Sequence, residues 1–76
     1  MITTSKVYIT TRRKGDAVEI LDAHRRLEYA RKQLDQLRDE AKAQGCRTLM
    51  TEAGCCLRTQ KGDVITYYEI TNRELK

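Results

Sequence analysis

The side chains best suited to chemistry in this chain are three cysteines and one histidine. Cys55 and Cys56 are adjacent, so in a strand they would point to opposite faces and could not chelate one metal ion. No C-x-x-C spacing is present, and in the predicted strand pairing Cys46 faces Gln60, away from the other two. We therefore predict no metal site and no cofactor, with Cys55 buried as an apolar side chain and Cys56 exposed.

The single histidine, His24, is predicted to lie on a helix beside its apolar stripe. A general base needs a nucleophile or a proton donor within reach, and usually a third group that orients it. No motif in the sequence supplies these groups, and no glycine lies in a phosphate-binding pattern such as G-x-x-x-x-G-K. We expect no catalytic residues and no enzyme activity.

A cluster of cations is the other candidate for chemistry. Arg12, Arg13 and Lys14 are adjacent and precede Asp16, the predicted start of a helix. Backbone N–H groups and the helix dipole attract anions at such a position. Either these cations bind an anion, or Asp16 occupies the position itself and the cations form a solvated turn. The candidate contacts for an anion or a nucleic acid are Arg12, Arg13, Lys14, Arg25 and Arg26.

The element that must position these residues is a long helix predicted from Asp16 to Gly45. Apolar residues recur there at alternating spacings of three and four, which is the pattern of one helix face. Asp16 and Glu19 resemble a capping box at its start, and Gly45 can take the left-handed conformation that ends a helix. The stripe consists of Ile20, Ala23, Leu27, Ala30, Leu34, Leu37 and Ala41.

Alternating segments rich in β-branched residues predict strands on both sides of this helix. They are Lys6–Thr11, Cys46–Thr51, Cys55–Thr59 and Val64–Thr71. Gly-containing turns connect the last three, and the first of these turns sets Leu49 opposite Leu57. We predict an α+β fold, a two-layer sandwich of β-α-β-β-β order with one long helix on a mostly antiparallel sheet of three to four strands. A single domain would span residues 1–76, with loose ends at residues 1–5 and 72–76.

The predicted register divides the strand side chains between two faces. The face packed against the helix holds Val7, Ile9, Leu49, Leu57, Val64, Tyr68 and Ile70. The outward face holds Tyr8, Thr10, Met50, Cys56, Arg58, Ile65 and Tyr67. This outward face is unusually apolar, and its combination of Tyr, Met and Arg is typical of binding interfaces. Its candidate partner-binding residues are Tyr8, Met50, Arg58, Ile65 and Tyr67. The alternative is that Tyr and Ile are present because they suit a pleated surface.

The predicted helix is too long for the predicted sheet. It would measure about 42 Å, whereas the strands would span roughly 20 to 27 Å. The apolar stripe nevertheless continues to Leu37 and Ala41, so a second copy of the helix is expected to cover the remainder in a homodimer. The whole stripe is then the self-association surface. The alternative is a helix that crosses the sheet diagonally or ends near Asp39.

Composition limits the function classes. The chain has 76 residues, a hydrophobic fraction of 39%, and 15 Lys and Arg against 11 Asp and Glu, for a formal net charge of +4. This mild basic excess permits nucleic-acid binding without requiring it, since several helix charges have an opposite partner one turn away. Three cysteines cannot all pair, and Met1–Lys6 carries no apolar leader, so we expect a cytoplasmic protein. No apolar run is long enough to cross a membrane.

These observations predict a small non-enzymatic binding protein. It would dimerise through its helix and engage a macromolecular partner, more readily a protein than a nucleic acid, because its cations are interleaved with acids and its outward face is apolar. A chain this short fits an accessory, regulatory or inhibitory factor of the kind that phages and mobile elements encode. One alternative is a nucleic-acid-binding regulator, with the five cations on phosphates and Tyr8 and Tyr67 near bases. The other is a structural subunit whose apolar excess is used up by oligomerisation.

Overall fold

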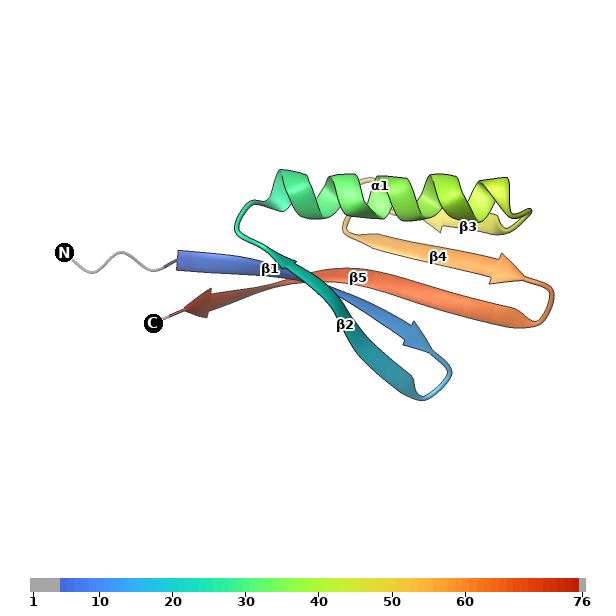
Figure 1. Cartoon of the computed structure of the whole chain (residues 1–76), viewed down its shortest axis with the longest axis horizontal. Helices are drawn as coiled ribbons and strands as arrows, with labels where there is room; N and C mark the ends of the chain where they lie inside the picture. The colour runs from blue at the N-terminus through green and yellow to red at the C-terminus, as the bar shows by residue number, and fades with distance from the viewer. Residues whose placement is uncertain (1–4, 76) are drawn as a thin grey trace.

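The computed structural model describes residues 5 to 75, with side chains from residue 6 to residue 74. The elements are β1 (Ser5–Lys14), β2 (Ala17–His24), α1 (Leu27–Ala43), β3 (Arg47–Met50), β4 (Cys56–Lys61) and β5 (Val64–Leu75). All neighbouring strands are antiparallel, in the order β2-β1-β5-β4-β3, and α1 packs on one face of this sheet (Figure 1). The predicted α+β fold with one helix on an antiparallel sheet is confirmed, with five strands instead of three to four.

The additional strand is β2, and here the predicted helix is wrong. Gly15, at a φ of +62°, and Asp16 form a two-residue turn that folds β2 back onto β1, with Arg13 opposite Val18. The register shifts between Thr10 and Thr11, and the resulting bulge places Ile20 and Ala23 on the same face of the sheet. A spacing of three on one face is also what a helix produces, which explains why the sequence pattern resembled a helical stripe.

Helix α1 is therefore shorter than predicted. Its 17 residues span about 26 Å, whereas the 12 residues of β5 span about 40 Å. The length mismatch is thus the reverse of the predicted one, because the sheet extends beyond the helix, and Figure 1 shows the β1–β2 turn projecting away from α1. The predicted end is confirmed, since Gly45 adopts a φ of +84° and donates its N–H to the Lys42 carbonyl. Within residues 5 to 75, no helix has the length and apolar character needed to cross a membrane.

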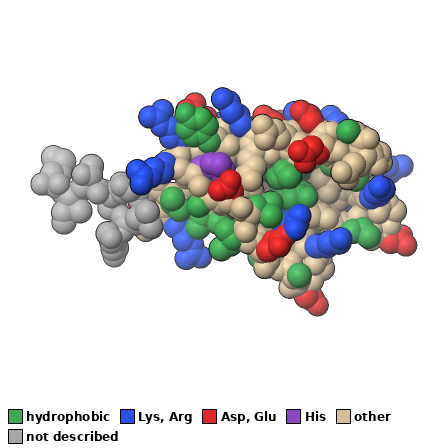
Figure 2. All heavy atoms as spheres, viewed as in Figure 1, with side chains coloured by type: hydrophobic (Ala, Val, Ile, Leu, Met, Phe, Trp, Pro, Cys, Tyr) green, Lys and Arg blue, Asp and Glu red, His purple; other side chains and the backbone are tan. Residues whose placement is uncertain are grey.

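The core lies between α1 and the sheet. Its buried hydrophobic residues are Ala30, Leu34, Leu57 and Ile70. Partly buried side chains pack around them, namely Tyr8, Leu27, Leu37, Met50, Cys55 and Tyr68. Figure 2 shows charged side chains projecting along α1 and hydrophobic side chains gathered over the strands below it. The helix thus buries one face and exposes a charged one, as its amphipathic pattern requires.

Two strands present the opposite face from the predicted one. Tyr8 and Met50 pack against the core and Thr10 is fully buried, although all three were predicted to point outward. Leu49, predicted to point inward, is 66% exposed, because β3 pairs Met50 with Leu57 and Leu49 with Arg58. A one-residue difference in register moves every side chain of a strand to the other face.

The β4–β5 hairpin agrees with the prediction, and its register extends further than expected. Gly62 and Asp63 form the turn, and Leu57 lies opposite Tyr68, with both side chains on the face packed against the helix as predicted. Residue 5 and residues 72 to 75 were predicted to be loose, but Ser5 begins β1 and residues 72 to 75 continue β5, where they pair with β1. Residues 1–4 and 76, also predicted to be loose, lie outside the described residues. The predicted pairing of Cys46 with Gln60 is wrong, since Arg47 occupies that position.

Candidate binding surface

The face of the sheet opposite α1, called the outer face below, carries a continuous row of side chains. Residues that are direct partners in the register share a face, and successive pairings link one residue from each of the five strands. In the order of the strands, this cross-strand row consists of Val18, Arg13, Tyr67, Arg58 and Leu49. Two arginines therefore flank a central tyrosine, and an aliphatic side chain lies at each end.

The outer face carries exposed hydrophobic side chains beside its charged ones. Among the described residues, six large hydrophobic side chains are exposed. Four of them lie on this face, with exposed fractions between 42% and 70%. They are Val18, Ile20, Leu49 and Tyr67. Isolated exposed hydrophobic residues are ordinary, but three of these four line one groove, and a group gathered in this way marks an interaction surface.

Arginines are the register partners of Tyr67 on both neighbouring strands, and one of them contacts its ring. The guanidinium carbon of Arg13 lies 5.1 Å from the centre of the Tyr67 ring, which is a cation–π arrangement. Arg58 is the partner of Tyr67 on the other side, and its Nη2 donates to Gln60 Oε1 at 3.4 Å. Arg58 Nε is buried and has no hydrogen-bond partner among the described residues. The row thus places the Tyr67 ring next to guanidinium groups, and the contact with Arg13 fixes the position of the ring.

A groove of about 370 Å³ runs along the row. Besides the row itself, its lining includes Thr11, Thr51, Cys56 and Glu69. In a flat sheet the edge strands β2 and β3 would be four strand spacings apart, about 19 Å. Val18 of β2 and Leu49 of β3 nevertheless line the same groove, so the sheet curls around its outer face and makes this face concave.

The positive charge of the chain is concentrated on this face. By the strand register, the outer face carries four arginines and one carboxylate. They are Arg13, Arg47, Arg58, Arg73 and Glu69. Three of the four net positive charges of the sequence therefore lie here, and the remainder of the chain is close to balanced.

Cys56 lines this groove but is not an activated nucleophile. Partial burial, and then the charges of Glu69 and Cys55, raise the pKa of the Cys56 thiol above its ordinary value. The thiolate is the reactive form, so a raised pKa lowers the reactivity at neutral pH. Cys56 is exposed, as predicted, whereas Cys55 packs against the core but is only partly buried.

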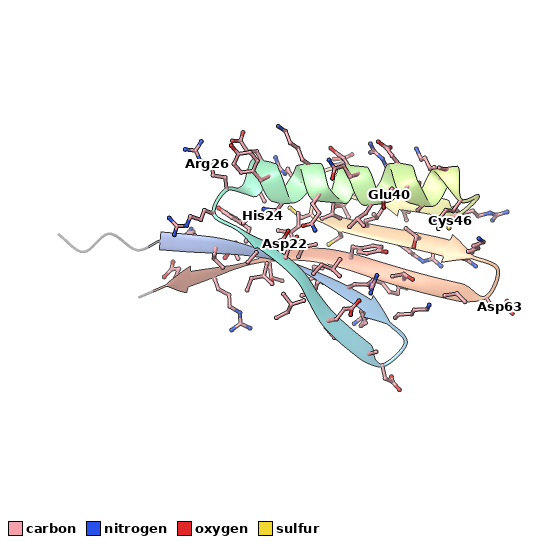
Figure 3. The ribbon with its side chains drawn as sticks, viewed as in Figure 1. Asp22, His24, Arg26, Glu40, Cys46 and Asp63 are labelled. Atoms are coloured by element: carbon pink, nitrogen blue, oxygen red, sulfur yellow. The ribbon has the colours of Figure 1, made fainter. Side chains whose placement is uncertain are left out.

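His24 has a structural role. It lies on β2, not on the predicted helix, and its Nε2 is 3.0 Å from Gln33 Oε1 of α1 and 3.6 Å from Asp22 Oδ2. Figure 3 shows Asp22 and His24 together where β2 passes α1. Within residues 5 to 75, no group of three or more His, Cys, Asp or Glu side chains is arranged to hold a metal ion. The contact with Gln33 instead ties β2 to the helix.

The structure brings together only part of the predicted partner-binding set. Arg58, Ile65 and Tyr67 are on the outer face, whereas Tyr8 and Met50 lie under α1. Sequence reasoning did not assign Val18, Ile20 and Leu49 to this face, since Ile20 was placed on the helical stripe and Leu49 on the face packed against the helix. The alternation of Val18 and Ile20 directly after Gly15 was the signal for a strand that could have identified the first two.

The predicted cationic set is divided between separate places. Arg12 forms an ion pair with Glu19 on the face that bears α1, whereas Arg13 is on the outer face. Arg25 and Arg26 follow β2, whose eight residues place them about 26 Å from the β1–β2 turn. One anion could not contact all five cations.

The predicted self-association stripe is divided as well. Ile20 and Ala23 are on β2, while Ala30 and Leu34 are buried against the sheet of the same chain. Leu27 and Leu37 also pack against this core. The helical stripe is therefore mostly used within the chain.

Comparison with protein-family models, curated proteins and solved structures gave no match, so the surface is interpreted from its own geometry.

Proposed function

We propose that the chain is a small non-enzymatic binding module that holds a protein partner on the outer face of its sheet. The observation that carries this proposal is the cross-strand row from Val18 to Leu49, an uncovered apolar surface with two arginines placed around a tyrosine. Tyr and Arg, held in defined positions, contribute most to the energy of protein interfaces. Such a module acts by occupying a surface of its partner, which is an accessory or inhibitory role. The three free thiols suit the reducing cytoplasm, where we place it.

A protein is favoured over a nucleic acid by the kind of side chain on this face. Binding to unpaired bases depends on aromatic rings on which the bases stack. Tyr67 is the exposed tyrosine of the outer face, and Arg13 already lies over its ring. The other exposed large hydrophobic side chains there are aliphatic and suit the apolar side chains of a protein.

Capture from a cell extract with a matched pair of tyrosine variants tests the proposal. Tyr67→Ala should abolish capture of the partner, whereas Tyr29→Ala should leave it intact, since Tyr29 is comparably exposed but lies on α1. Leu49→Ser, at the edge of the sheet, provides a second outer-face change. Circular dichroism verifies that each variant is folded. Equal capture by both tyrosine variants would refute binding through the outer face.

Nucleic acid is the second candidate, because four arginines lie on the outer face. It predicts binding of a single-stranded oligonucleotide that weakens steeply as salt rises. Arg13→Ala should then reduce the slope of this dependence, and nuclease treatment of the extract should abolish capture. A flat salt response would eliminate this candidate.

Self-association remains a separate proposal. The helix buries its apolar side within its own chain, so a dimer would have to use other residues. Light scattering over a range of concentrations measures the mass directly. A constant monomer mass would end the homodimer proposal and leave the binding module unaffected.

A further inference from the structure

We propose that the partner presents an acidic amphipathic α-helix to the outer face, with its apolar side in the groove and its carboxylates on the arginines. This inference rests on the proposed function and specifies the chemistry of the segment that is bound.

The charge distribution favours an anionic partner. Among the described strand residues, the outer face has four arginines and only Glu69 as an acid, and Arg13 and Arg58 line the groove itself. Uncompensated charge of one sign steers partners of the opposite sign and disfavours partners of the same sign. Arginine also forms bidentate hydrogen bonds with carboxylates.

The row has apolar positions spaced as an amphipathic helix would use them. Val18 and Leu49 at the two ends and Tyr67 at the centre form a line across the sheet, with Arg13 and Arg58 between them. This line covers four strand spacings, which is about 19 Å in a flat sheet and less in the curled one, so two to three turns of helix would follow it. Apolar residues at positions i, i+3, i+4 and i+7 of one helix would follow it, with Glu or Asp beside them.

The curvature of the face favours a helix over an extended segment. An added strand pairs with the free edge of β2 or β3 through backbone hydrogen bonds, and would leave the row uncovered. The groove lies instead on the face, between both edges. Helix α1 already packs on the opposite face of the same sheet (Figure 1), so a partner helix would complete a three-layer arrangement.

A second copy of this chain fits the face poorly. Two outer faces brought together would place eight arginines and two glutamates in one interface, because each contributes four and one. Like charges at an interface cost binding free energy. The charge that favours an acidic helix therefore opposes a homodimer through this face.

Synthetic peptides test the inference without knowledge of the natural partner. The probe is an amphipathic peptide of about 18 residues, long enough to cross the sheet, with a Leu stripe at helical spacing and Glu at the flanking positions. One control peptide has the same composition in scrambled order, and another has Lys in place of Glu. Fluorescence anisotropy of labelled peptides measures each affinity, and we expect the acidic helix to bind about tenfold or more tightly than either control, equivalent to about 1.4 kcal/mol.

Charge-changing variants locate the binding on the row. Arg13→Glu with Arg58→Glu should reverse the preference toward the Lys peptide, whereas Arg25→Glu, in the turn before α1, should leave it unchanged. Glu69→Gln should tighten binding of the acidic peptide, because it removes the one carboxylate of the outer face. This gain cannot result from unfolding, so it keeps the test valid if the double variant is unstable.

Each remaining outcome is decisive. Equal affinity for the acidic and basic peptides, or no effect of the double variant in a folded protein, overturns the acidic-helix inference. If Cys56 becomes better protected from alkylation as the protein concentration rises, without any peptide, a second copy occupies the face and the inference is overturned. Tighter binding of a single-stranded oligonucleotide than of the acidic peptide also overturns it. If capture from the extract depends on Tyr67 while the peptides show no preference, the proposed function stands and only this inference fails. If Tyr67→Ala does not affect capture, the proposed function itself fails.

Discussion

Arg13 and Tyr67 are direct partners on β1 and β5, and the Arg13 guanidinium carbon lies 5.1 Å from the centre of the Tyr67 ring. The contact joins two strands that are far apart in the sequence. It also limits the rotamers of both side chains on an open face, where neither is covered by other elements. A partner therefore meets groups that are already ordered, which reduces the entropy lost on binding.

The first prediction concerns this pair. In a double-mutant cycle with Arg13→Ala and Tyr67→Leu, the coupling free energy should be about 0.5 to 1 kcal/mol, the value for an exposed cation–π contact. Urea unfolding, monitored by circular dichroism, measures the unfolding free energy of the wild type, both single variants and the double variant. Strictly additive effects would mean that the two side chains do not interact in solution.

The second prediction compares two leucines on opposite faces of the sheet. Leu34 is fully buried under α1, and Leu34→Ala should cost about 2 to 5 kcal/mol of unfolding free energy because it leaves a cavity. Leu49 is 66% exposed, so Leu49→Ala should cost about 0.5 kcal/mol or less. Chemical denaturation of both variants measures the difference. Similar costs would show that Leu49 packs inward, as a register with Leu49 opposite Leu57 would require.

The third prediction concerns a buried hydroxyl. The side chain of Thr10 is fully buried, and its Oγ1 has no hydrogen-bond partner among the described residues. Thr10→Val keeps the shape and removes the unsatisfied group, so it should raise stability by about 1 to 3 kcal/mol. Thermal unfolding measures this change, and Thr11→Val on the outer face serves as the control. A loss of stability for Thr10→Val alone would indicate that the hydroxyl is hydrogen-bonded in solution.

The fold could be predicted where local signals act together, and not where they conflict. The β4–β5 hairpin was recoverable because Gly62 marks the turn and the alternation on both sides agrees with it. The segment Ala17–His24 was not recoverable from spacing, because the bulge between Thr10 and Thr11 gives a strand the spacing of a helix. Gly15 was the contrary signal, and the regular stripe that continues into α1 outweighed it.

The sequence predicted the kind of residues on the binding surface, but only some of the residues that form it. Alternation identifies which residues share a face, but it does not say which face a strand with apolar residues on both sides turns toward the helix. For β1 this choice depends on pairing with β5, and for β3 on a loop that shifts Leu49 by one position. Such contacts between distant segments are absent from a local pattern, whereas Arg58 and Tyr67, on the well-marked hairpin, were placed correctly.

The fourth prediction tests the β1–β2 hairpin. Gly15 has a φ of +62° in the turn, and an L side chain in this conformation costs about 1 to 2 kcal/mol. Gly15→Ala should therefore destabilise the protein, although nothing in the structure would clash with the added methyl group. If Gly15 instead preceded a helix, Gly15→Ala would leave the stability unchanged or raise it, because it would replace a flexible glycine. Thermal unfolding of Gly15→Ala thus distinguishes a hairpin from a helix at Ala17–His24.

The last prediction uses the thiol beside the groove. Burial, Glu69 and Cys55 raise the pKa of Cys56, so the thiolate fraction at mildly alkaline pH is lower than for a free cysteine. Glu69→Gln removes a negative charge, lowers this pKa toward its ordinary value and should accelerate alkylation of Cys56 by iodoacetamide. Peptide mass spectrometry measures the rate at each cysteine, with Cys46, which precedes β3, as the internal reference. An unchanged rate at Cys56 would mean that Glu69 points away from the groove. There would then be no reason to expect that Glu69→Gln tightens the binding of an acidic partner.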